Sequence, residues 1–172
     1  KSTTIVQQFP WVNLLSETIK WPTFARQLGY QHATWNILAF LDADTRPTKQ
    51  RFIKVLKQFG ENDQLWFLSW PYSFYDMSLF RQFISRFNRT FIVYPSSLFV
   101  WYFGVWGNMI IRKTVLDQMH WFDTGILFHW DDTDAARRAH QFAQSKFMLS
   151  LKMQTSARRY LHQWFFTTSY LY

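Results

Sequence analysis

The sequence predicts a single α/β domain built around a largely parallel β-sheet. Apolar runs of strand length alternate along the chain with segments whose apolar residues recur at helical spacing, and no repeat or low-complexity linker interrupts them. With 172 residues, of which 48% are hydrophobic, the chain is long enough for one core and too short for two ordinary domains. We therefore treat residues 1–172 as one domain.

The first part of the chain predicts a strand, a helix and a second strand. Residues 12–15 have the composition of a short strand, and residues 22–33 are expected to be helical because Pro22 favours a first helical turn. Residues 36–41, NILAFL, form a nearly continuous apolar run. Such a run is typical of a strand that is buried on both faces of a parallel sheet.

The next elements follow in the same alternation. Pro47 opens a predicted helix and Gly60 is expected to end it. The apolar residues of this helix recur at helical spacing: Phe52, Ile53, Val55, Leu56 and Phe59. Residues 65–69 and 109–111 then predict strands, with a helix over residues 77–88 between them.

Charge and composition restrict the partners and the compartment. A net charge of +8 favours anionic partners such as nucleotide phosphates, nucleic acid or acidic lipid. The chain has no cysteine, which excludes a disulfide framework and a thiolate metal site and suits the cytoplasm. The first residues, KSTTIVQQFP, lack the apolar core of a signal peptide.

Residues 91–111 form an uncharged stretch between basic flanks. The stretch is as long as a membrane span. Its proline, serine and glycine residues oppose a spanning helix, while its tryptophan and tyrosine residues suit a membrane interface. We expect a buried or interfacial segment, and hence a cytoplasmic protein that lies peripherally at a membrane.

Two carboxylates follow the apolar run 36–41. Asp42 and Asp44 flank one residue just beyond the predicted strand, where ligands bind in parallel α/β sheets. Two such carboxylates can turn toward a common point and supply hard oxygen ligands to Mg²⁺ or Mn²⁺ that substrate phosphates also hold. A solvated turn in which one aspartate caps the following helix is the alternative interpretation of the motif by itself.

Three blocks of the sequence resemble family 2 glycosyltransferases of the GT-A fold. The stretch TFARQLGYQHATWNILAFLDADTRP resembles the pattern A-R-N-x-G followed by a strand that ends in F-L-D-A-D. The stretch GNMIIRKTVLDQMHWFDTGILFHWDDTDAARRAHQFA resembles the block with G-N, G-G-F-D and E-D-x-D, and TSARRY resembles S-x-R-R. The resemblance implies a three-layer GT-A sandwich that moves a sugar from a nucleoside diphosphate donor to an acceptor hydroxyl, with inversion at the anomeric carbon.

The resemblance also implies roles for the first acidic pair and for three arginines. Asp44 matches the direct metal ligand and Asp42 a contact to ribose or metal, with Mg²⁺ or Mn²⁺ as cofactor. Arg158 and Arg159 match the arginines that bind the diphosphate. Arg26 matches a residue that contacts the donor phosphates or supports packing. The expected partners are a UDP- or GDP-sugar and a saccharide or lipid-linked acceptor.

A second acidic cluster, DDTD, supplies the proposed base. By the resemblance, Asp132 takes the proton of the acceptor hydroxyl during attack, and Asp131 stands where the family usually has glutamate. The other interpretation is an acidic helix N-terminus, because carboxylates there favour the helix dipole. Both interpretations can hold, since Asp134, Arg137 and Arg138 resemble the start of a helix.

The chain departs from the family at several turns and at its start. Only 5 residues are glycine and 10 are tryptophan. Eight tryptophans fall where the family commonly has glycine or another small residue: Trp11, Trp21, Trp35, Trp70, Trp106, Trp121, Trp130 and Trp164. Such a replacement costs on the order of 1 to 3 kcal/mol where the turn needs a positive φ. The chain also starts after the family's first two strands, so we expect an N-terminally truncated domain with impaired turnover.

Two other functional classes share some of these features. Haloacid-dehalogenase-type phosphohydrolases also end a strand in D-x-D, but they have Thr or Val two residues after the second acid, where this chain has Arg46. A non-enzymatic basic module that binds membrane or single-stranded nucleic acid would also use cations and aromatic residues. Because the aromatic residues are scattered through apolar segments, no nucleic-acid partner is expected.

Overall fold

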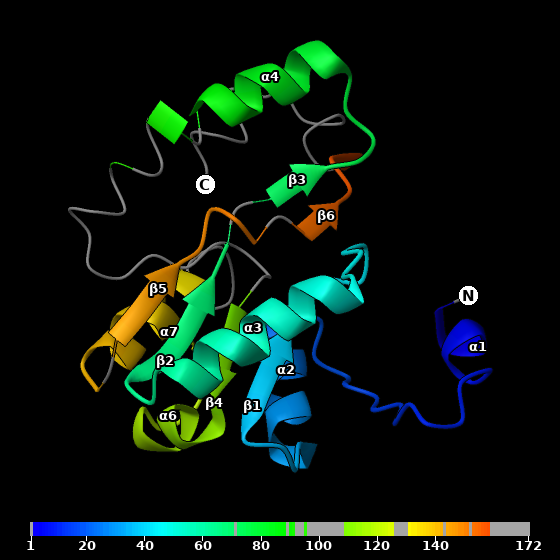
Figure 1. Cartoon of the computed structure of the whole chain (residues 1–172). Coiled ribbons are helices and arrows are strands. Elements are labelled where there is room, and N and C mark those ends of the chain that lie inside the picture. Colours follow the sequence, from blue (N-terminus) through cyan, green and yellow to red (C-terminus); the bar gives the residue numbers. More distant parts are fainter. Residues whose placement is uncertain are drawn as a thin grey trace.

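The computed structural model describes residues 2–70, 72–88, 90–91, 95, 109–125, 131–142, 144–151 and 153–158. A four-stranded sheet lies between helices on its two faces, and a two-stranded sheet lies beyond the carboxyl ends of β2 and β5 (Figure 1). The predicted α/β fold with three layers is therefore confirmed.

The larger sheet has the strand order β1-β4-β2-β5. Its strands are β1 (Ile37–Phe40), β4 (Met109–Arg112), β2 (Leu65–Ser69) and β5 (Gln144–Phe147). β1 and β2 each pair antiparallel with β4, and β2 pairs parallel with β5, so β1, β2 and β5 run in one direction. The smaller sheet pairs β3 (Tyr72–Phe74) in parallel with β6 (Met153–Thr155).

The strand register defines one edge of the larger sheet. Phe40 and Ser69 both lie opposite Met109, and Ser69 also lies opposite Phe147. This row marks the carboxyl ends of the three strands that share a direction. The segments that follow β1, β2 and β5 therefore leave the sheet at the same edge, which we call the carboxyl edge.

Helices cover both faces of the larger sheet. They are α2 (Pro22–His32), α3 (Lys49–Glu61), α6 (Lys113–Gln118) and α7 (Asp131–His140), with α1 (Ser2–Val6) and α4 (Leu79–Asn88) lying apart from the sheet (Figure 1). One core joins the sheet to α2, α6 and α7: Tyr30, Leu38, Phe67, Met109, Ile111, Val115, Leu116, Met119, Phe122, Ala135, Ala136 and Ala139. The other joins it to α3: Val55, Phe59, Leu65, Leu68, Trp70, Ile110, Leu151 and Met153.

Four local predictions are wrong. The run 36–41 does not form a strand that is buried on both faces, because β1 is an edge strand and only Leu38 of its four residues is buried. Pro47 does not open its helix, because α3 starts at Lys49 after an N-cap at Thr48.

The other two concern residues 12–15 and Gly60. Residues 12–15 do not form a strand, and Val12 and Leu14 are exposed. A strand is stable when a neighbouring strand pairs with its backbone groups, and none of the strands that the structure describes does so here. Gly60 does not end its helix either, because α3 continues through Glu61 to a C-cap at Asn62.

The uncharged stretch over residues 91–111 falls mostly outside the described residues. Its final residues belong to β4 and are buried. The expectation of a buried or interfacial segment therefore stays a prediction for the rest of the stretch.

Candidate functional site

The turn that carries Asp42 and Asp44 lies at the carboxyl edge, directly after β1. The backbone N–H of Thr45 donates to the carbonyl of Asp42 at 2.9 Å, which closes the turn. Asp42 is exposed and Asp44 is half-buried. Local sequence thus places both carboxylates just beyond the strand, as predicted.

The end of β6 meets this turn. The hydroxyl of Thr155, which is buried, donates to Asp44 Oδ1 at 2.9 Å. The backbone N–H of Arg46 donates to the carbonyl of Gln154 at 2.7 Å. The D-x-D turn and the TSARRY segment, which are separated by more than 100 residues, are therefore in direct contact.

Asp76 joins the same group of residues. It follows β3, and its carboxylate accepts hydrogen bonds from Ser156 Oγ at 2.5 Å and from the Ala157 backbone N–H at 2.6 Å. Burial alone would raise the pKa of Asp76, but these two bonds, its own backbone N–H and the charge of Arg46 outweigh burial and lower the pKa. Asp76 is therefore ionised at neutral pH and fastens the segment that leads to Arg158.

Arg46 provides a cation beside these acids. Its guanidinium lies over the Tyr75 ring, with Cζ 3.6 Å from the ring centroid. Such stacking orients a guanidinium while leaving its edge free to approach an anion. The site therefore combines carboxylates at the end of β1 with a cation fixed between β1 and β3.

The residues at the end of β1 fit a divalent cation. Mg²⁺ and Mn²⁺ prefer oxygen ligands, and in nucleotide sites Mg²⁺ takes one or two carboxylates and completes its shell with phosphate oxygens and water. Asp42 and Asp44 supply such a donor pair. No cluster of three or more acidic, histidine or cysteine side chains occurs within the described ranges, so those side chains do not form a metal cage without a substrate.

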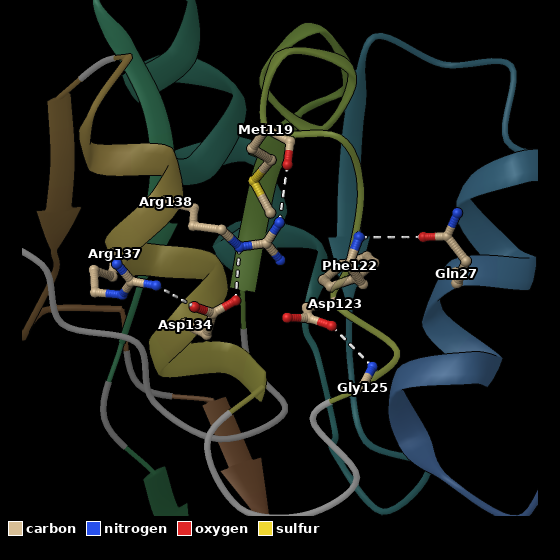
Figure 2. Close-up of polar contacts among 8 residues, drawn as sticks. All are labelled: Gln27, Met119, Phe122, Asp123, Gly125, Asp134, Arg137 and Arg138. Carbon is tan, nitrogen blue, oxygen red and sulfur yellow. Dashed lines mark hydrogen bonds and ion pairs between the residues drawn. The ribbon is translucent and has the colours of Figure 1, made fainter.

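The second acidic block begins α7, and Figure 2 shows its polar contacts. Asp134 accepts from Arg137 at 2.8 Å and from Arg138 Nε at 2.6 Å, and Arg138 also donates to the carbonyl of Met119 at 2.9 Å (Figure 2). The side chain of Asp134 is 11% exposed. Arg138 therefore attaches α7 to the turn after α6, and Asp134 orients its guanidinium.

Asp131 and Asp132 are the first two residues of α7. The side chains of these two residues lie outside the described part of the structure. A connection of only three residues joins the end of α7 to the start of β5. Because α7 also packs on the sheet, this short connection makes it run opposite to β5. The first turn of α7 is thereby directed toward the carboxyl edge, where Asp42 and Asp44 also lie.

The turn between α6 and residue 125 connects α7 with α2. His120 and Trp121 have φ values of 55° and 69°, in the left-handed region. The backbone N–H of Phe122 donates to Gln27 Oε1 on α2 at 3.2 Å, and that of Gly125 donates to Asp123 at 2.8 Å (Figure 2). The turn thus holds α2 and α7 at fixed positions on one face of the sheet.

The predicted arginines have different positions. Arg26 is half-buried on α2. Arg158 is exposed just after β6, with its backbone N–H bonded to Ser156 Oγ at 3.1 Å. Arg159 and Trp130 lie outside the described residues.

Sequence reasoning missed Asp76, Thr155 and the placement of Arg46. Asp76 had a signal, because it follows the short apolar-aromatic run YSFY just as Asp42 follows residues 36–41. Thr155 had none, since its contact with Asp44 depends on how β6 approaches the end of β1. The structure thus adds residues on the β3–β6 side of the site.

Comparison with known proteins gives matches of two kinds, to a family and to solved structures. Residues 4–119 match the family described as Glycosyl transferase family 2. No curated protein matches the chain. Among solved structures, the mannosyltransferase PcManGT from Pyrobaculum calidifontis, in complex with GDP-Man and Mn²⁺, matches with a TM-score of 0.65 at 16% sequence identity. The match covers 91% of this chain and 43% of that one, so the chain spans less than half of that protein's length.

Proposed function

This chain belongs to glycosyl transferase family 2 and has the GT-A fold, and from this premise we propose that it transfers a sugar from a nucleoside diphosphate donor to an acceptor hydroxyl with inversion. The observation that supports the proposal most directly is the contact between Asp44 and Thr155. It joins the acidic turn to the segment that leads to Arg158, so carboxylates and a cation converge at one edge of the sheet.

We propose that Asp44, with Asp42 beside it, holds Mg²⁺ or Mn²⁺ together with the donor diphosphate. When bound there, a divalent cation would stabilise the negative charge that grows on the diphosphate as the glycosidic bond breaks. Thr155 orients the Asp44 carboxylate through its hydrogen bond. Arg158 and Arg159 follow directly and are suited to bidentate contact with phosphate oxygens, with Arg26 as a further donor contact.

The acceptor side is proposed to depend on the first turn of α7. Asp132 would accept the proton of the acceptor hydroxyl, and Asp131 would contact the acceptor. Within this helix Asp134 pairs with Arg137 and Arg138, and Arg138 holds the helix in place through its bond to the carbonyl of Met119. A saccharide or a lipid-linked sugar is the expected acceptor, and UDP or GDP the expected nucleotide.

We also propose that turnover is impaired. The left-handed backbone at Trp121 stores strain in the turn that holds α7. A small displacement of a catalytic base reduces the rate strongly, because proton transfer needs hydrogen-bond distance to the acceptor.

The first test is calorimetric titration of Mn²⁺ with UDP or GDP into the chain and into Asp44→Asn. We expect binding that needs both the metal and the nucleotide and that is lost in the variant. Asp63→Asn is the matched control, because Asp63 is a fully exposed aspartate before β2, at the opposite edge of the sheet. Equal binding in wild type and Asp44→Asn, or binding that does not respond to metal, would refute the donor site.

A further inference from the structure

Helix α4 is amphipathic, with a sharp division between its two sides. At 100° per residue, its apolar residues occupy one arc of about 140°. These residues are Leu79, Phe80, Phe83, Ile84 and Phe87, and Phe91 follows three residues beyond the end of the helix. The remaining positions carry arginine, glutamine, serine and asparagine, and none is acidic.

The apolar side of α4 faces away from the protein. Leu79 is 84% exposed, Phe80 72% and Phe83 66%, and Phe87 and Phe91 are exposed as well. The polar residues Gln82 and Ser85 are less exposed, and Gln82 donates to the carbonyl of buried Met77 at 2.8 Å. In a helix of a protein that remains in water, the apolar side normally faces the core. The orientation of α4 is therefore inverted.

The inverted helix lies at the outer side of the molecule. Figure 1 draws α4 beyond β3, on the side away from the four-stranded sheet. The rings of Phe87 and Phe91 pack on each other, with centroids 4.6 Å apart, so part of the apolar side forms a continuous aromatic surface. Such a contiguous exposed apolar patch marks a binding surface.

The charge on α4 and on the residue that follows it has one sign. No acidic residue occurs between Asp76 and Asp117, while α4 contains Arg81 and Arg86 and Arg89 follows it directly. Arg81 is exposed on α4 itself. Phenylalanine and leucine on one side of a helix with arginine on the other is the pattern of helices that lie in the interface of an anionic bilayer.

We propose that α4 docks this chain onto an anionic lipid bilayer. A helix of ten residues is about 15 Å long, which is half of a hydrocarbon core of about 30 Å, so α4 lies along the surface. Among the described residues, no helix has the length and apolarity needed to cross a membrane. The apolar side chains enter the boundary between headgroups and acyl chains, and the arginines contact lipid phosphates.

The position of α4 relates docking to the candidate site. Only Met77 and Ser78 separate the helix from Asp76, which fastens the segment beside Asp44. Docking through α4 therefore holds the carboxyl edge close to the membrane surface. The further inference that the acceptor is lipid-linked rests on the proposed function, whereas the docking itself does not.

Cosedimentation with vesicles tests the docking directly. The probes are vesicles of phosphatidylcholine with about 30% phosphatidylserine and vesicles of phosphatidylcholine alone, each at low salt and at about 0.5 M salt. We expect the chain to bind the anionic vesicles at low salt, and Phe80→Ser/Phe83→Ser to lower the partition coefficient by about tenfold or more. Arg81→Gln should weaken binding less, and high salt should weaken it for every form.

The matched control is Ile53→Ser/Leu56→Ser on α3. It removes two apolar side chains that are also exposed, at 54% and 58%, from a helix that is itself basic, with Lys49, Arg51, Lys54 and Lys57, so general attraction of a basic helix to anionic lipid is controlled for. Docking through α4 predicts that this variant binds vesicles like the wild type. Equal losses in the two double variants, or no binding of the wild type to anionic vesicles, would overturn the proposal.

Two further measurements exclude other occupants of the apolar side. If a second copy covered it, sedimentation velocity without lipid would show a dimer that Phe80→Ser/Phe83→Ser dissociates. If another part of this chain covered it, the same variant would unfold at clearly lower urea than the wild type. Docking on lipid instead predicts a monomer and an unchanged unfolding midpoint, and either of the other results would refute it.

Discussion

His120 and Trp121 have a backbone conformation that glycine adopts far more readily than either of them. The Trp121 N–H donates to the carbonyl of Leu116 at 2.8 Å and the His120 N–H to that of Asp117 at 3.3 Å, after the C-cap of α6 at Met119. These two bonds form a Schellman motif, in which His120 occupies the position that usually requires glycine. The turn is therefore correctly bonded but strained.

The other described tryptophans do not share this strain. The φ values of Trp11, Trp21, Trp35 and Trp70 are not in the left-handed region, and Trp11 and Trp35 are 77% and 79% exposed. Trp70 is fully buried, and its indole N–H has no hydrogen-bond partner within the described structure. Among the described tryptophans, the expected backbone cost therefore occurs at Trp121 alone. The unpaired donor of Trp70 is a cost of another kind, which the sequence did not predict.

Replacing His120 by glycine should stabilise the protein. His120→Gly removes the side-chain cost of the left-handed conformation, and we expect the free energy of unfolding to rise by about 1 kcal/mol. Urea unfolding at neutral pH measures the change. Trp121→Gly is a less clear test, because the Trp121 ring lies 6.5 Å from that of buried Tyr30 and its removal also loses packing.

Thr114→Gly is the matched control for this prediction. Thr114 is an exposed residue of α6, where glycine is less favourable than threonine by roughly 0.3 kcal/mol or more. The two glycine substitutions should therefore shift the unfolding midpoint in opposite directions. A loss of stability in both variants would show that the His120 side chain contributes contacts that outweigh the strain.

Among the elements, the pair β3 and β6 determines whether the candidate site is complete. β3 pairs with β6 from Tyr72 and Met153 through Phe74 and Thr155, and the residues that follow both strands are joined through Asp76. The turn after β1 is bonded to this small sheet through Thr155 and Gln154. The small sheet therefore connects the acidic turn to the arginines of the TSARRY segment.

The charge of Asp76 should give this connection a pH dependence. The pKa of Asp76 is lowered in the folded protein. Its contribution to the free energy of unfolding is therefore fully present above the ordinary aspartate pKa, and it is lost as the pH falls through the pKa of Asp76 in the folded protein. At pH 7, Asp76→Asn should lower the free energy of unfolding by about 1 kcal/mol, since it weakens two hydrogen bonds. The difference between variant and wild type should shrink when the pH is lowered below the ordinary aspartate pKa of 3.8.

Hydrogen exchange gives a local measure of the same effect. The Ala157 amide donates to Asp76, so it should exchange several-fold faster in Asp76→Asn at neutral pH. Amides of β2, in the larger sheet, should keep their protection. Unchanged exchange at Ala157 would mean that Asp76 does not hold the segment.

For the whole molecule, the candidate site links parts of the chain that are far apart. The end of β1, the end of β6 and the start of α7 all come to the carboxyl edge. A ligand that binds the folded protein there stabilises it by mass action. Binding of donor nucleotide and metal should thus be visible as global stability.

Adding Mn²⁺ with UDP or GDP should raise the melting temperature. At a free concentration of about 100 times Kd, the gain is about 2.7 kcal/mol, which corresponds to a shift of several degrees in a domain of this size. Scanning calorimetry measures the shift, and removing the metal with EDTA should reverse it. The shift should be absent in Asp44→Asn, and a shift that persists there would place the ligand elsewhere.

The sequence alone determined much of the layered core and one half of the site. The runs 36–41 and 65–69 and the helices around residues 22–33 and 47–60 follow from local periodicity, so their positions are predictable within a few residues. Asp42 and Asp44 directly follow an apolar strand, which places them at its end whatever the remaining fold. The short elements β3, β5, β6 and α6 were not predicted, because three to six residues carry too little periodic pattern.

The tertiary structure alone decided the rest, because the deciding contacts join residues that are far apart in the chain. Residues 12–15 have strand composition but lack a described neighbouring strand, so composition was insufficient. The hydrogen bonds of Thr155 to Asp44 and of the Ala157 N–H to Asp76 form only when β3 and β6 pair beyond the larger sheet. The sequence likewise makes α4 amphipathic, but which side faces outward depends on how the helix is attached to the fold.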